Sequence, residues 1–138
     1  GEALVMEIPT ELLYTKTHEW ARRDANQVVV GITSHAQDEL RDIVYVELPK
    51  LGRSVKQGEP VAVVESVKAA FDIYAPISGK IVAANADAVK DPAVLNREPY
   101  GKGWLFKLKA SAPAEAGKLM DHAAYEKFLA SEAVHGSH

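Results

Sequence analysis

The sequence contains no cysteine, and this absence narrows the chemistry that the chain can perform. Without a thiol there is no cysteine nucleophile, no disulfide and no thiolate ligand for a metal ion. Any redox chemistry would have to come from a bound cofactor. The sequence also lacks an apolar run near the roughly 18 residues that cross a membrane as a helix, so we expect no membrane partner.

Positive charge is not in excess either. Sixteen Lys and Arg residues stand against 19 Asp and Glu residues, which gives a formal net charge of −3. Nucleic-acid-binding proteins neutralise phosphates with an excess of Lys and Arg, so we expect no nucleic-acid partner. With 47% hydrophobic and 25% charged residues, the chain has the composition of a soluble globular domain that needs no metal or disulfide for stability.

The sequence predicts a single domain, because no linker divides it. We place this domain over residues 6–131, beginning at the first Met. Residues 1–5 lack the charged and apolar regions of a secretory signal, so we expect a vector-derived addition there. Residues 132–138 are expected to form a flexible tail. The five histidines show no recognisable metal-ligand spacing, so no metal site is predicted.

Short segments rich in β-branched and aromatic residues dominate the middle of the chain. Glycines and prolines separate them at a spacing typical of sandwiches and barrels rather than of parallel α/β sheets. The expected strands are residues 28–32, 43–48, 60–64, 73–75, 80–83 and 104–108.

Two segments predict helix instead. Ser34 and Gln37 have the spacing of a capping box, which predicts a short helix that ends near Leu40. Residues 114–130 are rich in Ala, Glu, Lys and Leu and predict a second helix, with Asp121 as an additional N-cap. The apolar face of that helix is expected to consist of residues spaced by four: Met120, Ala124 and Phe128.

The chain-breaking residues around Lys68 are nearly symmetric. Pro60 lies eight residues before Lys68 and Pro76 lies eight after it. Proline is tolerated at strand ends and excluded from strand centres, so two equal strands that pair with each other must reverse at Lys68. At about 3.3 Å per residue, each strand would hold the lysine about 20 Å or more from its base. A lysine at such a tip is exposed and can reach several large partners in turn.

The composition of the tip does not indicate a turn at Lys68. Residues 65–70 contain no Gly, Asn or Asp, the residues that usually mark a tight hairpin turn. From this pattern alone, Lys68 fits equally well as an ordinary surface lysine in a long strand or in a short helix. Symmetry and composition together leave these alternatives open.

Six motifs, in order along the chain, resemble those of the glycine cleavage H-protein family, and together they extend over about residues 8–128. They are Tyr-Thr-Lys-Thr-His-Glu-Trp at 14–20, Val-Gly-Ile-Thr at 30–33 with Ala-Gln at 36–37, Val-Glu-Leu-Pro at 46–49, Val-Glu-Ser-Val-Lys-Ala-Ala at 64–70, Asp-Ile-Tyr-Ala-Pro at 72–76, and Pro-Tyr-Gly at 99–101 with Gly-Trp at 103–104. Each motif alone is weak, whereas six in register are specific.

The resemblance implies a mainly β fold, a lipoyl-domain-like barrel-sandwich hybrid of two antiparallel sheets with a short internal helix and a C-terminal helix. It also implies lipoate bound covalently to Lys68 in amide linkage. Biotin carriers of related fold place Met on both sides of the lysine, whereas Val67 and Ala69 flank it here. The expected surroundings of the tip are completed by Glu65, Ser66 and Phe71.

The function implied is that of a lipoyl carrier with no catalysis of its own, since the cofactor supplies the chemistry. In the family, the carrier takes the aminomethyl group of glycine from a pyridoxal-phosphate glycine decarboxylase to a folate-dependent aminomethyltransferase. Dihydrolipoyl dehydrogenase then reoxidises the carrier, and a lipoate ligase or lipoyltransferase attaches the cofactor. We expect a monomer in a bacterial cytoplasm, or in the mitochondrial matrix if the source is a eukaryote.

By the same resemblance, Thr17, Glu19 and Asp72 are expected to line a surface cleft near the loaded arm. The carried amine is cationic, so a carboxylate is a suitable partner, and a shielded cleft would slow loss of the group. The alternative is that Glu19 and Asp72 are solvated acids at strand ends.

The sequence departs from the family pattern at two positions. Arg41 follows the short helix where Gly is common, and we expect a position that needs positive φ and a slightly different helix exit. Phe71 replaces a small polar residue, so we expect a peripheral ring beside the arm rather than a core side chain.

Three functions compete at this point. The first is the glycine-cleavage carrier, and the second is a related carrier that relays lipoyl groups to other enzymes. The third is an unmodified interaction module, which the presence of Lys68 disfavours. An independent enzyme fits least well, because a reactive lysine needs a desolvated pocket rather than a hairpin tip.

Overall fold

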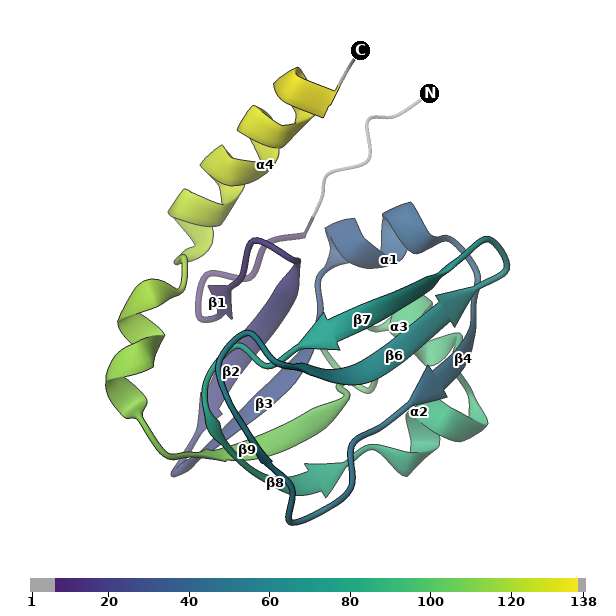
Figure 1. Ribbon diagram of the computed structural model, residues 1–138. Helices are drawn as coiled ribbons and strands as arrows, with labels where there is room; N and C mark the ends of the chain where they lie inside the picture. Colours follow the sequence, from purple (N-terminus) through teal and green to yellow (C-terminus); the bar gives the residue numbers. More distant parts are fainter. Residues whose placement is uncertain (1–6, 137–138) are drawn as a thin grey trace.

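The computed structural model describes residues 7–136 and contains two antiparallel sheets (Figure 1). The larger sheet has the strand order β1-β2-β3-β9-β8-β5, and the smaller has the order β4-β6-β7. The larger is built from β1 (Leu13–Tyr14), β2 (Glu19–Asp24), β3 (Gln27–Ile32), β9 (Phe106–Ala110), β8 (Gly79–Ala84) and β5 (Ser54–Val55). The smaller is built from β4 (Ile43–Glu47), β6 (Pro60–Ser66) and β7 (Ala70–Tyr74). The predicted mainly β fold of two antiparallel sheets is confirmed.

The core lies where the two sheets face each other. Side chains of the larger sheet meet those of the smaller one in a single apolar cluster. Its members include Val30, Ile32, Ile81, Phe106 and Leu108 from the larger sheet and Val46, Val64 and Ile73 from the smaller, each at most 4% exposed. Burial of this apolar surface is the main force that holds the sheets together.

Helices occupy the connections and the C-terminal end. They are α1 (Ser34–Leu40), α2 (Ala86–Lys90), α3 (Val94–Arg97), the 3₁₀ helix η1 (Pro113–Lys118) and α4 (His122–Gly136). A second apolar cluster lies between α4 and the outer side of the larger sheet, where the Tyr14 and Tyr125 rings stack at 4.5 Å. No helix in the described range is long and apolar enough to cross a membrane.

Each of the six expected strands lies on an observed strand, with small differences at the ends. Strand β2 was not predicted, because its polar second half, Arg22 to Asp24, hides the pattern of a buried strand. Helices α2 and α3 were not predicted either, because they are too short to show a helical period.

The N-cap of α1 is Thr33, not Ser34 as the capping-box spacing predicted. Thr33 has extended backbone, and its hydroxyl accepts a hydrogen bond from the Ala36 N–H at 3.2 Å. Ser34 is already the first helical residue, so its hydroxyl is one position too late to cap. The predicted end of the helix at Leu40 is confirmed.

The expected helix over residues 114–130 is in fact two helices. The chain is extended at Met120, which forms a two-way backbone bridge with Tyr14 at 2.8 and 2.9 Å, and this bridge separates η1 from α4. Asp121 then caps α4 as predicted, accepting from the Ala124 N–H at 2.8 Å. Met120 and Phe128 pack against the second apolar cluster, as predicted, whereas Ala124 is exposed and its neighbour Tyr125 is the buried residue between them.

The C-terminal helix also runs further than expected. Helix α4 continues to Gly136, beyond the predicted domain end at 131 and into the predicted tail, because no Gly or Pro interrupts it earlier. The predicted addition at residues 1–5 and the last two residues of the predicted tail, 137–138, lie outside the described residues.

Arg41 itself adopts the positive φ that its position was expected to need. Its φ and ψ are 66° and −140°, a conformation that side chains with a Cβ rarely adopt. The side chain of Asn96 in α3 holds this exit, donating to the Arg41 carbonyl at 2.6 Å and accepting from the Ile43 N–H at 3.0 Å. The neighbouring structure therefore stabilises a strained residue.

Replacing Arg41 by Gly should raise the free energy of unfolding by about 1 kcal/mol. Relief of the backbone strain should stabilise the folded state by about 1–3 kcal/mol. The greater freedom of Gly in the unfolded chain reduces this gain by about 0.5–1 kcal/mol. Urea unfolding at constant slope measures the change. Arg41→Ala is the control, since it removes the same side chain but keeps the Cβ, and should change stability by less than about 0.5 kcal/mol. An equal gain in both variants would assign the effect to the side chain.

Candidate functional site

Lys68 lies at the tip of the hairpin formed by β6 and β7. The register pairs Val63 with Asp72 and Glu65 with Ala70, so the two strands reverse within residues 66–69, as the proline symmetry predicted. The tip projects at one end of the smaller sheet, where α1 passes into β4 (Figure 1). The alternatives of a continuous strand or a helix at Lys68 are excluded.

Ser66 takes the place of the missing turn residue. Its backbone N–H donates to the Ala69 carbonyl at 2.9 Å, and its hydroxyl oxygen accepts from the N–H groups of Lys68 and Ala69 at 3.2 and 3.3 Å. Within the described range, no tip residue has positive φ. A serine side chain that binds local N–H groups can stabilise a turn without Gly or Asn.

The tip combines a fixed backbone with free side chains. The Val67 N–H donates to the Asp42 carbonyl at 3.3 Å, which ties the turn to the connection between α1 and β4. Ser66 is 8% exposed, whereas Val67 is 70% exposed and Lys68 and Ala69 are also exposed. Among the described residues the Lys68 amine has no hydrogen-bond or ion-pair partner. The whole Lys68 side chain, including its amine, is therefore accessible to other proteins.

A cleft of about 300 Å³ begins beside the hairpin, and we call it the β7 cleft. It is lined by the turn between β1 and β2, by α1 and by β7, and its wall begins at Phe71, about 10 Å along the strand from Lys68. The lining residues are Lys16, Thr17, His18, Ile32, Ala36, Glu39, Leu40, Phe71, Asp72, Ile73 and Tyr74. Most of these positions come from segments far apart in the sequence, so no local pattern could have grouped them.

Two of the three predicted cleft residues lie in the β7 cleft. Thr17 and Asp72 line it, and both are exposed. Glu19 does not; it lies behind Tyr74, where it borders a neighbouring cavity of about 230 Å³. The structure thus separates Glu19 from Asp72.

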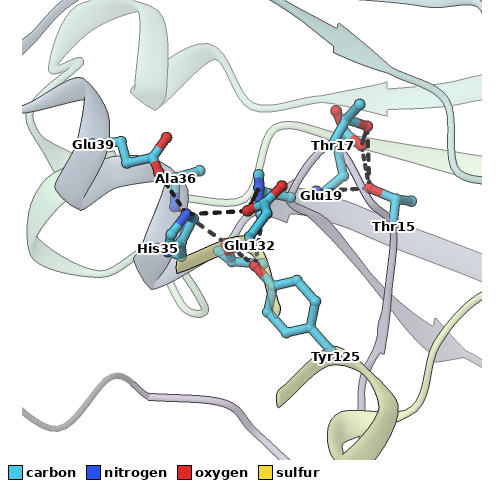
Figure 2. A network of polar contacts seen from close by, with 10 residues as sticks. Thr15, Thr17, Glu19, His35, Ala36, Glu39, Tyr125 and Glu132 are labelled. Atoms are coloured by element: carbon cyan, nitrogen blue, oxygen red, sulfur yellow. Dashed lines mark hydrogen bonds and ion pairs between the residues drawn. The ribbon is translucent and has the colours of Figure 1, made fainter. Parts of the chain in front are cut away.

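Glu19 is fully buried, so the alternative of a solvated acid is excluded for this residue. One carboxylate oxygen accepts from the hydroxyls of Thr15 and Thr17 (Figure 2). The other accepts from the Tyr74 N–H at 3.0 Å. Burial raises the pKa of the Glu19 carboxyl, against the hydrogen bonds, which act to lower it. These contacts join the β1–β2 turn to β7. Thr17 and Tyr74, which both bind Glu19, line both cavities.

Phe71 is peripheral, as predicted. Its side chain is 47% exposed, whereas Ile73, two residues on and on the same side of β7, is 4% exposed. Side chains alternate along a strand, so the two residues share a face and the core ends between them. Phe71 forms part of the β7 cleft instead of the core.

Replacing Phe71 by Ser should therefore lower the free energy of unfolding by about 1 kcal/mol or less. Ile73→Ala is the matched control in the same strand, and should cost about 2–5 kcal/mol because it leaves a cavity in the core. Both changes follow from urea midpoints at constant slope. A loss of about 3 kcal/mol or more for Phe71→Ser would contradict the peripheral position.

Comparison with known proteins gives a consistent result. The family model described as glycine cleavage H-protein matches residues 12–132. The chain is 53% identical over 128 residues to the glycine cleavage system H protein of Thermus thermophilus, covering 93% of this chain and all of that one. It is 55% identical over 127 residues to the glycine cleavage system H protein of Cronobacter sakazakii, with 91% and 98% covered.

A solved structure has the same fold. The crystal structure of a glycine cleavage system H protein from Mycobacterium marinum superposes with a TM-score of 0.80 at 39% identity, covering 91% of this chain and 99% of the other.

Proposed function

The chain belongs to the glycine cleavage H-protein family, and from this we propose that it carries lipoate on Lys68 and moves the aminomethyl group of glycine between the enzymes of the system. The donor would be the pyridoxal-phosphate glycine decarboxylase and the acceptor the folate-dependent aminomethyltransferase, with reoxidation by dihydrolipoyl dehydrogenase. The observation that carries the proposal is the exposed amine of Lys68 on a fixed hairpin tip.

The geometry of the tip suits a carrier. A ligase must reach the amine to acylate it, and each partner must later admit the arm into its own site. Lys68 meets both needs because its side chain is free while its backbone is held by Ser66. Tethering the cofactor to a fixed point raises its effective concentration at each partner without requiring tight binding.

The β7 cleft fits a folded-back lipoyl arm. Bound lipoate supplies the disulfide chemistry that a chain without cysteine does not have. The cleft offers apolar walls to a hydrocarbon arm through Leu40, Phe71 and Ile73, and polar groups to its end through Thr17 and Asp72. Its volume is at the small end of the range for ligand pockets, which suits a single slender arm.

Of the two acids, Asp72 is the better partner for a cationic amine. It is exposed on the cleft wall, whereas both oxygens of Glu19 already accept hydrogen bonds. We therefore assign Asp72 to the carried group and Glu19 to positioning: its bond to the Tyr74 N–H keeps β7 in place against the β1–β2 turn. Thr17 connects the two, since it donates to Glu19 and also lines the β7 cleft.

The unmodified protein, incubated with lipoate, ATP and a lipoate ligase, should gain one lipoyl group on Lys68. The lipoylated protein should then support glycine–bicarbonate exchange by a pyridoxal-phosphate glycine decarboxylase. Intact mass and peptide mapping measure the first step, and incorporation of labelled bicarbonate measures the second. Lys68→Arg should give neither the label nor exchange, because its side chain cannot form the amide.

Lys56→Arg and Lys80→Arg are the controls, since both lysines are exposed and neither is at the tip. Both variants should be labelled and active like the parent. A label on either lysine, a label on Lys68→Arg, or equal exchange without lipoate would refute the carrier function. If the lipoylated protein fails with the decarboxylase but donates lipoyl groups to other lipoyl-dependent enzymes, the relay function replaces it.

Asp72→Asn should leave lipoylation intact and increase ammonia release from the loaded protein by about threefold to tenfold. The reason is the loss of one charge-assisted hydrogen bond at a solvent-accessible site, worth about 1 kcal/mol. The measurement is the first-order rate of ammonia release. Asp87→Asn, an acid on α2 outside the cleft, serves as the control and should have the parent rate.

Glu19→Ala should shorten the lifetime of the loaded protein for a different reason. It leaves the Tyr74 N–H and two hydroxyls without their buried acceptor, so it should also lower the free energy of unfolding by about 1–3 kcal/mol. If ammonia release is unchanged in both variants, Asp72 does not contact the carried group and Glu19 does not position the cleft for it.

A further inference from the structure

Two histidines and two glutamates from three separate segments meet at the end of the β7 cleft. His18 belongs to the turn between β1 and β2, His35 and Glu39 lie one turn apart on α1, and Glu132 lies on α4. Ligand atoms of His18, His35 and Glu132 all lie within 4.8 Å of one another. Figure 2 shows His35 between the carboxylates of Glu39 and Glu132.

The separations are close to those of a metal coordination sphere. Around a tetrahedral zinc ion with bonds of about 2.0–2.2 Å, neighbouring ligand atoms are about 3.3–3.5 Å apart. Nε2 of His18 lies 3.3 Å from Oε1 of Glu132, and Nε2 of His35 lies 3.9 Å from the same oxygen. Oε1 of Glu39 is 2.6 Å from the His35 nitrogen. The first separation matches the coordination sphere, the second is wider and the third is shorter. His18, His35 and Glu132 thus form the core of the group, and the side chains of His35 and Glu39 would have to rotate for Glu39 to become a fourth ligand.

Within the described part of the chain, the Nε2 atom of His35 lies within ion-pair range of Glu39 and Glu132 but forms no hydrogen bond. It is shielded from solvent, and neither nearby carboxylate is oriented to form a hydrogen bond with it. A buried imidazole nitrogen without such a bond carries a desolvation cost unless another partner is present. A metal ion in front of this nitrogen would supply that partner.

A second layer of contacts can orient His18 for coordination. Its Nδ1 lies 2.8 Å from the Tyr125 hydroxyl, which lies 2.8 Å from the Thr33 hydroxyl oxygen. Either hydroxyl can be the donor in the Thr33–Tyr125 bond. When Tyr125 donates to Thr33, its oxygen can accept from the Nδ1–H of His18. That tautomer leaves Nε2 of His18 with a free lone pair facing Glu132, the arrangement in which metal-binding histidines are held.

We propose that His18, His35, Glu39 and Glu132 form a binding site for one divalent transition-metal ion of the zinc class. Two imidazoles and two carboxylates suit zinc and its neighbours in the first transition row, and the two negative charges balance the ion. The carboxylates provide access from solvent, with side chains 63% exposed for Glu39 and 42% exposed for Glu132. The histidines are the inner ligands, with side chains 14% exposed for His18 and 21% exposed for His35.

Such an ion would join α4 to the body of the protein at the cleft. Without it, the cluster connects α4 to α1 and to the β1–β2 turn only through ion pairs and the Tyr125 contacts. An ion bound by the folded state alone stabilises that state in proportion to the logarithm of its concentration. The site uses no part of the lipoyl arm, so it is tested on unlipoylated protein and is independent of the carrier function.

The test is titration of the unlipoylated full chain with Zn²⁺, with binding followed by calorimetry and thermal unfolding. We expect one equivalent to bind at micromolar dissociation constant or tighter, and Tm to rise by about 5 °C or more at a hundredfold excess over that constant. Mg²⁺ should have no effect, because it prefers oxygen ligands alone. Glu132→Gln and His35→Gln should each weaken Zn²⁺ binding at least tenfold. Glu132 is exposed, so its variant keeps the fold.

Three controls separate the site from adventitious binding. Glu126→Gln and His122→Gln change the same residue types elsewhere on α4 and should bind Zn²⁺ like the parent. The double variant His135→Gln/His138→Gln removes the two C-terminal histidines and should also retain binding. Unaltered binding in Glu132→Gln and His35→Gln, loss of binding in the C-terminal double variant, or no stoichiometric binding to the parent would each overturn the proposal.

Discussion

The buried carboxylate of Glu19 connects the two sheets, and the position of the cleft depends on it. Glu19 begins β2 of the larger sheet, and its Oε2 accepts from the Tyr74 N–H at the end of β7 in the smaller sheet. Burying a carboxylate costs free energy unless donors surround it, and the hydroxyls of Thr15 and Thr17 complete the set. Because these donors come from the turn before β2 and from β7, the carboxylate holds both walls of the cleft at once.

The hairpin turn also depends on a side chain that accepts backbone hydrogen bonds. A two-residue reversal usually needs Gly or Asn, whose freedom would also let the tip move. Here the Ser66 hydroxyl satisfies the N–H groups of Lys68 and Ala69, and Asp42 accepts from Val67, so every residue keeps negative φ. The result is a tip whose backbone is held by hydrogen bonds while the Lys68 side chain is exposed, as a carrier of a tethered group requires.

The strands and the ends of the hairpin could be predicted because prolines and β-branched residues mark them locally in the sequence. Pro60 and Pro76 mark the strand ends, so their symmetry indicated a reversal at Lys68, although the lack of turn residues left a continuous strand or a helix open until the structure was known. The core strands followed from their β-branched residues. The cap at Thr33 was missed because Ser34 is an equally good cap by composition, and only the extended backbone at Thr33 decides between them. The break at Met120 was missed because its cause, the bridge to Tyr14, is more than a hundred residues away.

The same limit explains why the cleft was predicted in part and the histidine cluster not at all. Thr17, His18 and Glu19 are consecutive, yet Glu19 faces the hydroxyls of Thr15 and Thr17 while His18 faces Tyr125 and Glu132. The backbone of His18, with φ at 71°, produces this division, because the reversal in the turn sends neighbouring side chains to different sides. One strained residue therefore places the sheet-joining carboxylate on one side and the imidazole cluster on the other. His18 also lines the β7 cleft and contacts Phe128 of α4, so one residue connects the C-terminal helix with the cleft proposed to hold the arm.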